Sequence, residues 1–191
     1  MPTVTALRDA RRGRVAVELD GAAWRTLPVE VVVRAELSEG RALDRPTLRR
    51  LRRELRRAEA LALAGRALRA RDLSRHRLAE RLSAAAVAPA AVVESLDVLA
   101  DAGLVDDGRF ARSRAQALAE RGYGDAAIEH DLERQGVAGE LVKVALEELP
   151  DELERARRLV ERRGHGVKTA RYLASKGFGE EAVRSAAGVE P

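Results

Sequence analysis

The sequence of 191 residues contains no cysteine, few aromatic residues and no apolar run near the length of a membrane helix. The lack of cysteine excludes disulfides, thiolate metal ligands and cysteine nucleophiles. Aromatic residues make up 3% of the chain, so a core must be built mostly from alanine, leucine and valine. Because no signal peptide is visible either, we expect a cytoplasmic protein without a membrane partner.

Charge is sorted along the chain, although the net charge is only +4. Residues 1–40 are neutral, residues 41–81 carry +9, residues 82–153 carry −9 and residues 154–191 carry +4. Nearly all of the positive charge comes from arginine. Two basic segments that flank an acidic one predict contact with a polyanion or with a charged protein surface.

The start of the chain has the pattern of a small β-rich extension. Apolar and polar residues alternate over residues 14–19, which is typical of a half-buried strand. Asp20-Gly21 follows and suits a tight hairpin turn, which predicts a return strand over residues 22–27. Residues 3–7 could add a third strand to this hairpin.

An amphipathic helix is predicted over residues 44–57, with Asp44 as its N-cap. Leucines at three- and four-residue steps form one apolar stripe along it. Arginines occupy the other side, namely Arg49, Arg50, Arg53, Arg56 and Arg57. Two interpretations stay open: these arginines form a solvated face, or they bind phosphate or acidic groups.

A spaced pattern occurs three times in the rest of the chain. The copies are Arg71, Ser74, Leu78, Leu82, Val87, Val92; then Arg121, Gly124, Ile128, Leu132, Val137, Val142; then Arg162, His165, Thr169, Leu173, Phe178, Val183. In the later copies Gly136 and Gly177 stand where a helix can end in the left-handed conformation. The first copy has Ala86 there, so we expect its cap to differ.

Each copy has room for three helices. They are predicted at 58–71, 74–86 and 89–102, at 107–121, 124–135 and 139–148, and at 151–163, 166–176 and 180–187. A unit this short buries its apolar face poorly alone, so we expect neighbours to stack into an elongated, curved array. The predicted organisation is an N-terminal β-rich extension (1–43), an arginine-rich linking helix (44–57), and three repeats (58–105, 106–149 and 150–191). The fold class is mainly α.

No constellation for catalysis or for a cofactor is found. A Gly-rich phosphate loop is absent, and the three histidines fall in different repeats. The pair Asp106-Asp107 could suggest acid–base chemistry, but adjacent residues on a helix do not face each other. We interpret the pair as the cap of a helix. The protein is therefore expected not to be an enzyme and to hold no metal or cofactor.

The most distinctive segment runs from Gly103 to Ala111 and reads Gly-Leu-Val-Asp-Asp-Gly-Arg-Phe-Ala. Together with Arg71-Asp72-Leu73-Ser74, with residues 121–128 (Arg-Gly-Tyr-Gly-Asp-Ala-Ala-Ile) and with residues 173–178 (Leu-Ala-Ser-Lys-Gly-Phe), it resembles the RecX family of bacterial recombination regulators. The resemblance covers roughly residues 58–187.

The resemblance implies three tandem three-helix repeats and a non-enzymatic regulator. Such a protein would bind the RecA recombinase filament and modulate its activity in DNA repair and recombination, with inhibition as the expected direction. It would also bind single- or double-stranded DNA weakly and in a salt-sensitive way. We expect it to act as a monomer. The alternative is a helix-turn-helix-like regulator that binds a specific DNA sequence.

The basic segments supply the predicted contacts to RecA or DNA. These candidates are Arg69, Arg71, Arg75, Arg77, Arg81, Arg162, Arg163, Lys168, Arg171 and Lys176. Any one of them could equally be a solvated surface charge. The predicted core residues are Leu78, Leu82, Leu96, Ile128, Leu132, Leu146 and Leu173.

Overall fold

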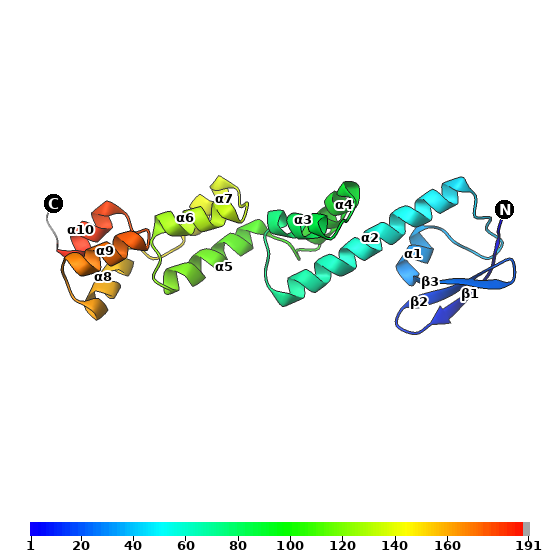
Figure 1. The fold of residues 1–191 in the computed structure, drawn as a ribbon, viewed down its shortest axis with the longest axis horizontal. Helices are drawn as coiled ribbons and strands as arrows, with labels where there is room; N and C mark the ends of the chain where they lie inside the picture. Colours follow the sequence, from blue (N-terminus) through cyan, green and yellow to red (C-terminus); the bar gives the residue numbers. More distant parts are fainter. Residues whose placement is uncertain (189–191) are drawn as a thin grey trace. The chain divides into compact units, whose positions relative to one another are not determined.

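A computed structural model describes residues 1–188, which form three β-strands followed by ten α-helices (Figure 1). The mainly helical fold class with a small β-rich start is confirmed. The chain divides into two compact units: residues 1–71 with 79–101, and residues 72–78 with the chain from Ala102 onward. Among the described helices, none combines the length and the apolar character that crossing a membrane requires.

The N-terminal sheet is antiparallel, with its strands in chain order: β1 (Val4–Ala10), β2 (Arg14–Leu19) and β3 (Ala22–Pro28). The expected turn residues Asp20 and Gly21 both have positive φ, at 50° and 81°. Val15 and Val17 face the core, as the alternation predicts. Strand β1, which is predicted over residues 3–7, is longer than expected and reaches Ala10. The short helix α1 (Val29–Arg34) closes this core against the next helix.

The long helix α2 (Arg45–Ala70) corrects one expectation. The sequence pattern predicts two helices in this region, 44–57 and 58–71, but one helix of 26 residues covers both. The physical reason is that residues 57–60, Arg-Ala-Glu-Ala, contain strong helix formers and no glycine, proline or cap. Asp44 is the N-cap, as predicted: it accepts a 2.8 Å hydrogen bond from the Thr47 N–H. Hydrogen bonds from Thr47 lower the pKa of Asp44.

The remaining helices lie within two residues of the predicted ends. They are α3 (Arg75–Ala84), α4 (Pro89–Asp101), α5 (Asp107–Glu120), α6 (Asp125–Arg134), α7 (Gly139–Glu147), α8 (Glu152–Arg163), α9 (Val167–Ser175) and α10 (Glu180–Ala187). Six of the seven predicted core residues are buried, since each lies below a tenth exposed. Leu146 is only half-buried. On α7 the buried face is formed instead by Val142 and Ala145, three residues apart.

The three middle helices, α3, α6 and α9, end in the same way. An N–H after the helix bonds a carbonyl five residues back: Val87 to Leu82 at 3.1 Å, Val137 to Leu132 at 3.2 Å, and Phe178 to Leu173 at 3.2 Å. The residue before each donor has a positive φ: 58° at Ala86, 74° at Gly136 and 80° at Gly177. The expectation of a different cap in the first copy is therefore wrong. The same hydrogen bond forms with alanine in the left-handed conformation, although glycine is the usual residue at this position.

We expect the substitution Ala86→Gly to stabilise the protein. The left-handed conformation costs an L-residue about 1–2 kcal/mol, which glycine avoids. The greater freedom of glycine in the unfolded chain opposes this gain by about 0.4–1 kcal/mol. The net gain should be about 0.5–1 kcal/mol in the free energy of unfolding, measured by urea denaturation. The control Ala62→Gly, at an exposed position inside α2, should lose about 1 kcal/mol. A less stable Ala86→Gly variant would contradict the prediction.

Within the second repeat, an ion pair ties α5 to α6. Arg114 donates two hydrogen bonds to Asp131, from Nε at 2.7 Å and from a terminal nitrogen at 3.0 Å. This contact lowers the pKa of Asp131 and raises that of Arg114. Because the folded pKa of Asp131 lies below its unfolded value, the pair stabilises the fold above that unfolded value.

The contribution of this pair should be lost as the pH falls through the folded pKa of Asp131. We therefore expect the Asp131→Asn variant to lose stability less steeply than the wild type below about pH 4. Urea denaturation at a series of acidic pH values measures this difference. Equal steepness in the two proteins would show that Asp131 contributes nothing to acid denaturation.

Candidate nucleic-acid and protein interface

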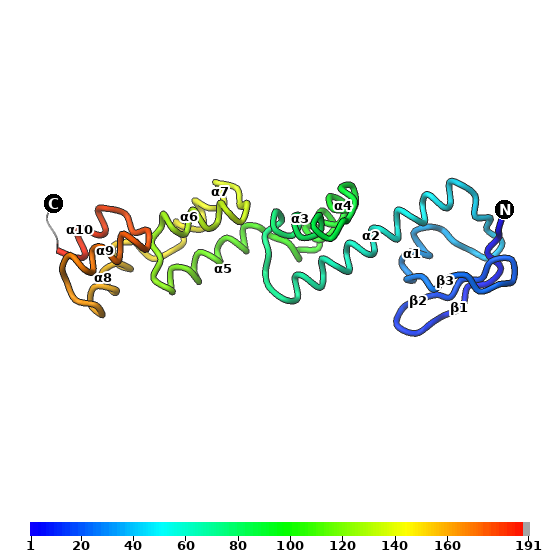
Figure 2. Tube along the Cα trace, viewed as in Figure 1, coloured from blue at the N-terminus to red at the C-terminus, as the bar shows by residue number. Residues whose placement is uncertain are grey.

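In the second unit, the middle helices meet head to tail. The start of α3 lies against the end of α6, where the Ser74 Oγ donates a 2.5 Å hydrogen bond to the Gln135 carbonyl. The start of α6 lies against the end of α9, where the Gly124 N–H donates a 2.9 Å bond to the Lys176 carbonyl (Figure 2). Helix starts leave N–H groups without partners and helix ends leave carbonyls without partners, so each junction satisfies both.

At each junction an acidic side chain also accepts a hydrogen bond from a backbone N–H. Asp107, the first residue of α5, accepts a 2.7 Å bond from the Arg75 N–H. Glu152, the first residue of α8, accepts a 2.7 Å bond from the Asp125 N–H. Asp106 caps α5 itself by accepting from the Arg109 N–H, and this bond lowers the pKa of Asp106. The interpretation of Asp106-Asp107 as capping residues is confirmed.

Two of the predicted contact residues belong to the first of these junctions. The Arg75 backbone is held by Asp107, and Arg77 Nε donates a 3.2 Å hydrogen bond to the Gln135 side-chain oxygen. Both arginines are half-buried. Their position gives them a structural role that their place in a basic segment did not indicate.

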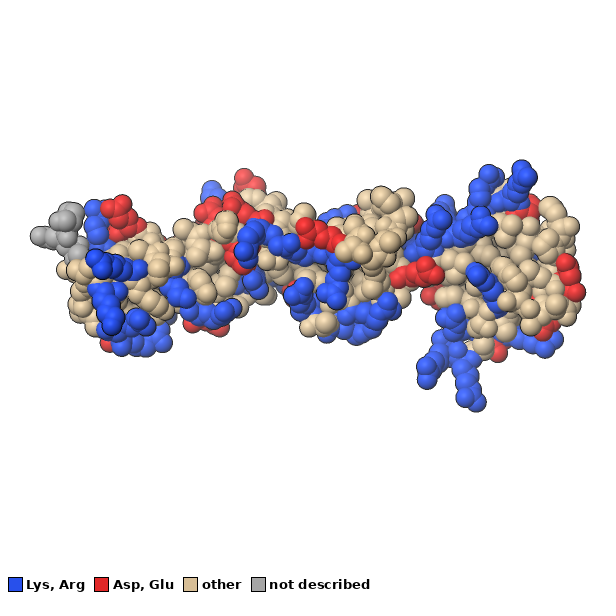
Figure 3. Space-filling view, in the orientation of Figure 1, with Lys and Arg blue, Asp and Glu red and all other residues tan. Residues whose placement is uncertain are grey.

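The other predicted residues are divided between the two units. Arg69 and Arg71 lie at the end of α2, and Arg81 lies on α3; all three are exposed and belong to the first unit. In the second unit, Arg162 and Arg163 end α8, Lys168 and Arg171 lie on α9, and Lys176 follows α9. Basic side chains gather over α8 and α9 in the space-filling view (Figure 3).

Arg163 and Lys176 lie close to three residues that are not among the predicted contacts. The Tyr172 ring has the Arg163 guanidinium 3.7 Å from its centroid and the Lys176 Nζ at 5.8 Å. The Tyr123 ring has the same Nζ at 4.3 Å and the Arg121 guanidinium at 5.7 Å. We call these five residues the cation–tyrosine cluster. They alternate as cation, ring, cation, ring, cation.

The cation–tyrosine cluster contains every tyrosine of the chain. Both rings are half-buried, while Arg121 and Arg163 are exposed. Within residues 1–188, no carboxylate forms an ion pair with the three cations of the cluster. The faces of the rings attract the cations but leave their charge uncompensated. Such a surface can receive an anionic partner, and aromatic and basic side chains combine in this way in many nucleic-acid interfaces.

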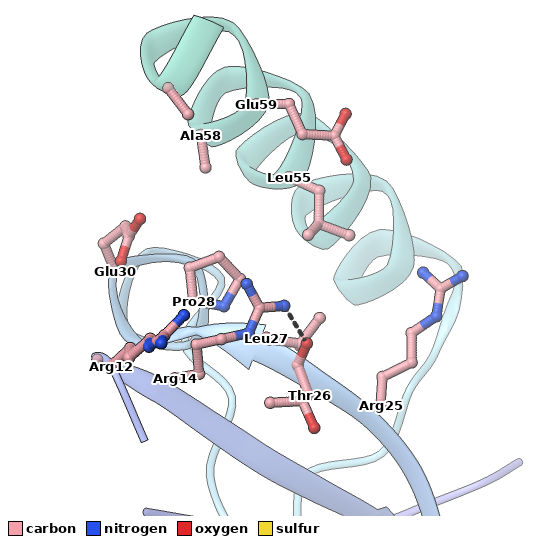
Figure 4. A pocket seen from close by; sticks show the side chains of 12 residues that line it. Arg12, Arg14, Arg25, Thr26, Leu27, Pro28, Glu30, Leu55, Ala58 and Glu59 are labelled. Atoms are coloured by element: carbon pink, nitrogen blue, oxygen red, sulfur yellow. Dashed lines mark hydrogen bonds between the residues drawn. The ribbon is translucent and has the colours of Figure 1, made fainter. Parts of the chain in front are cut away.

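The first unit contains a pocket of about 710 Å³ between β3 and α2 (Figure 4). Arg12, Arg14 and Arg25 line it together with Glu30 and Glu59, so its positive charge is largely balanced. The Arg14 guanidinium donates a 2.7 Å bond to the Thr26 carbonyl of the edge strand β3. Arg14 of this pocket is therefore already hydrogen-bonded within the sheet. Among the described residues, no group of three acidic or histidine side chains could hold a metal ion.

Together, the repeated caps and the head-to-tail junctions define a protein of tandem three-helix units. A family model described as "RecX, second three-helix domain" matches residues 106–146. The regulatory protein RecX of Chromohalobacter salexigens is 38% identical over 130 residues, which cover 63% of this chain and 86% of the relative. The chain belongs to the RecX family.

Further relatives and structures agree with this assignment. The regulatory protein RecX of Halorhodospira halophila is 36% identical over 132 residues, 64% of this chain and 82% of the relative. A crystal structure of a regulatory protein RecX matches with a TM-score of 0.84 and 19% identity over the full length of both chains. RecX from Lactobacillus salivarius matches with a TM-score of 0.61 and 19% identity, over 68% of this chain and 93% of its own. At such low identity the two structures support the fold alone.

The cation–tyrosine cluster should also stabilise the junction between the second and third repeats. Lys176 contacts both rings, so Lys176→Gln should lower the free energy of unfolding by about 0.5–1 kcal/mol. Lys176→Arg, which keeps the cation, should restore most of the loss. The control Lys143→Gln removes an exposed lysine whose ion pair with Glu147 is loose, at 3.9 Å, and should change stability by less than about 0.5 kcal/mol. Equal losses in the two glutamine variants would argue against the ring contacts.

Proposed function

We propose that this protein is a non-enzymatic regulator that binds the RecA–DNA filament and restrains recombinase activity in DNA repair and recombination. The relatives that match the chain are named regulatory proteins, which supports the regulatory part of the proposal. The observation that carries the contact with a nucleoprotein is the cation–tyrosine cluster. Its three cations are held in place against two rings and lack acidic partners within the described residues.

The sorted charge of the chain suits a partner of mixed composition. A filament of protein on DNA presents phosphates and protein side chains together, and a ligand with basic and acidic segments can contact both. Charge complementarity of this kind sets the register and the association rate more than the affinity. Tandem repeats add further weak contacts to the same partner, and several linked contacts bind more tightly than one.

The alternative of a helix-turn-helix regulator requires the arginines of α3 to enter a DNA groove. Arg75 and Arg77 are instead half-buried at the junction with α6, where Arg77 is hydrogen-bonded to Gln135. The positions of these two arginines therefore favour the filament proposal. Tight binding to one duplex sequence over random DNA would reverse this preference.

The proposal is tested by binding to RecA assembled on single-stranded DNA, with strand exchange measured in the same samples. We expect the wild type to pellet with the filaments and to slow exchange. A variant with Arg163, Lys168, Arg171 and Lys176 all changed to glutamine should bind several-fold more weakly, with the largest difference at low salt.

The matched control changes Arg112, Arg134, Arg158 and Arg184 to glutamine. These four arginines lie in the same unit and are about half exposed or more, and their ion pairs are long, at 3.5–3.8 Å. The control loses the same net charge, so it should bind close to the wild-type level. The proposal fails if the wild type neither binds the filaments nor alters exchange.

A further inference from the structure

The arginine face of α2 contains two classes of side chain. Arg50, Arg53 and Arg57 form ion pairs with Glu36, Glu54 and Glu94, respectively. Arg49, Arg52 and Arg56 are exposed and have no ion pair within the described residues. Their spacing of three and four residues places them on one side of the helix. Of these six arginines, three are therefore used by the fold and three are left for another partner.

The three arginines without an ion pair, together with Arg53, line a groove between α2 and the start of α4. The groove has a volume of about 320 Å³ and is lined by Arg49, Arg52, Arg53 and Arg56 from α2. Ala88, Ala90 and Ala91 form the opposite side. Glu94 is the single acidic residue of the lining, and its carboxylate is already paired with Arg57 at 3.3 Å. All of these residues belong to the first unit, so the groove is a feature of that unit alone.

The lining of the groove indicates the chemistry of its partner. Planar guanidinium groups match the oxygens of a phosphate and can donate two hydrogen bonds to each one. The alanine side chains are small and leave room for a thin chain to approach. Among the lining residues there is no aromatic ring on which a base could stack and no amide that could read a base edge. The groove therefore suits a sugar–phosphate backbone without sequence preference.

We propose that the groove formed by Arg49, Arg52 and Arg56 binds the phosphate backbone of a DNA strand, as a second nucleic-acid contact apart from the cation–tyrosine cluster. The surplus of arginine over free carboxylate in the groove carries this proposal. It does not rest on the proposed function, because DNA binding by the groove requires no RecA.

The test uses the full chain and a fluorescent single-stranded oligonucleotide of mixed sequence, without RecA. Fluorescence anisotropy gives the affinity at a series of salt concentrations. The logarithm of the binding constant falls with the logarithm of salt by about 0.7 for each contacted phosphate of a single strand. The triple variant R49Q/R52Q/R56Q should therefore have a slope shallower by about 2 and a weaker affinity at low salt.

The control R11Q/R34Q/R41Q removes the same charge from exposed positions elsewhere in the first unit. It should keep nearly the wild-type slope. Equal slopes in the wild type and the groove variant, or an equal reduction in the control, would overturn the proposal. So would a groove variant that binds DNA normally but no longer binds RecA free of DNA, because the groove would then receive a protein. A wild type that binds DNA through the groove but does not affect RecA filaments would support this inference and count against the proposed function alone.

Discussion

The hydrogen bonds that join the start of one middle helix to the end of the next are the contact on which the second unit depends. A helix end is polar on every side, and burying it without partners would cost several kcal/mol. Here Ser74 and Gly124 occupy corresponding places, as do the turns at Gln135 and Lys176, so one solution is used twice. Close approach is possible because the Gly177 backbone lies directly against Ala127, where a Cβ on residue 177 would come within 2.6 Å of that residue.

This contact also decides which charges remain for function. At the junctions Asp107 and Glu152 accept backbone N–H bonds and Arg77 donates to Gln135, although the sequence presents these residues as ordinary members of charged segments. On α2, Arg50, Arg53 and Arg57 likewise form ion pairs, with Glu36, Glu54 and Glu94. Among the described residues, the cations without an ion pair include two basic surfaces: the cation–tyrosine cluster in one unit, and the groove of Arg49, Arg52 and Arg56 in the other. Neither surface coincides with the full extent of a basic segment.

Much of the local structure could be predicted because it is encoded by nearby residues. Helix ends follow from caps such as Asp44 and Asp106, and core positions such as Ile128 and Leu173 follow from the helical period. Two local expectations failed: residues 57–60 contain no glycine, proline or cap that could end α2, and Ala86 adopts the conformation usually left to glycine. At Ala86 the hydrogen bond from the Val87 N–H to the Leu82 carbonyl closes the same turn that glycine closes in the other copies.

Spacing along the chain was sufficient to predict the three helical repeats, most of their caps, most of the core and the family resemblance. Which arginines are free, and which tyrosines they contact, depends on the tertiary structure. Tyr123 and Tyr172 are 49 positions apart, and Lys176 contacts both because the junction brings two repeats together. An ion pair or a cation–ring contact depends on the distance between two groups in space. The sequence does not give that distance, so a paired arginine and a free one cannot be told apart in it.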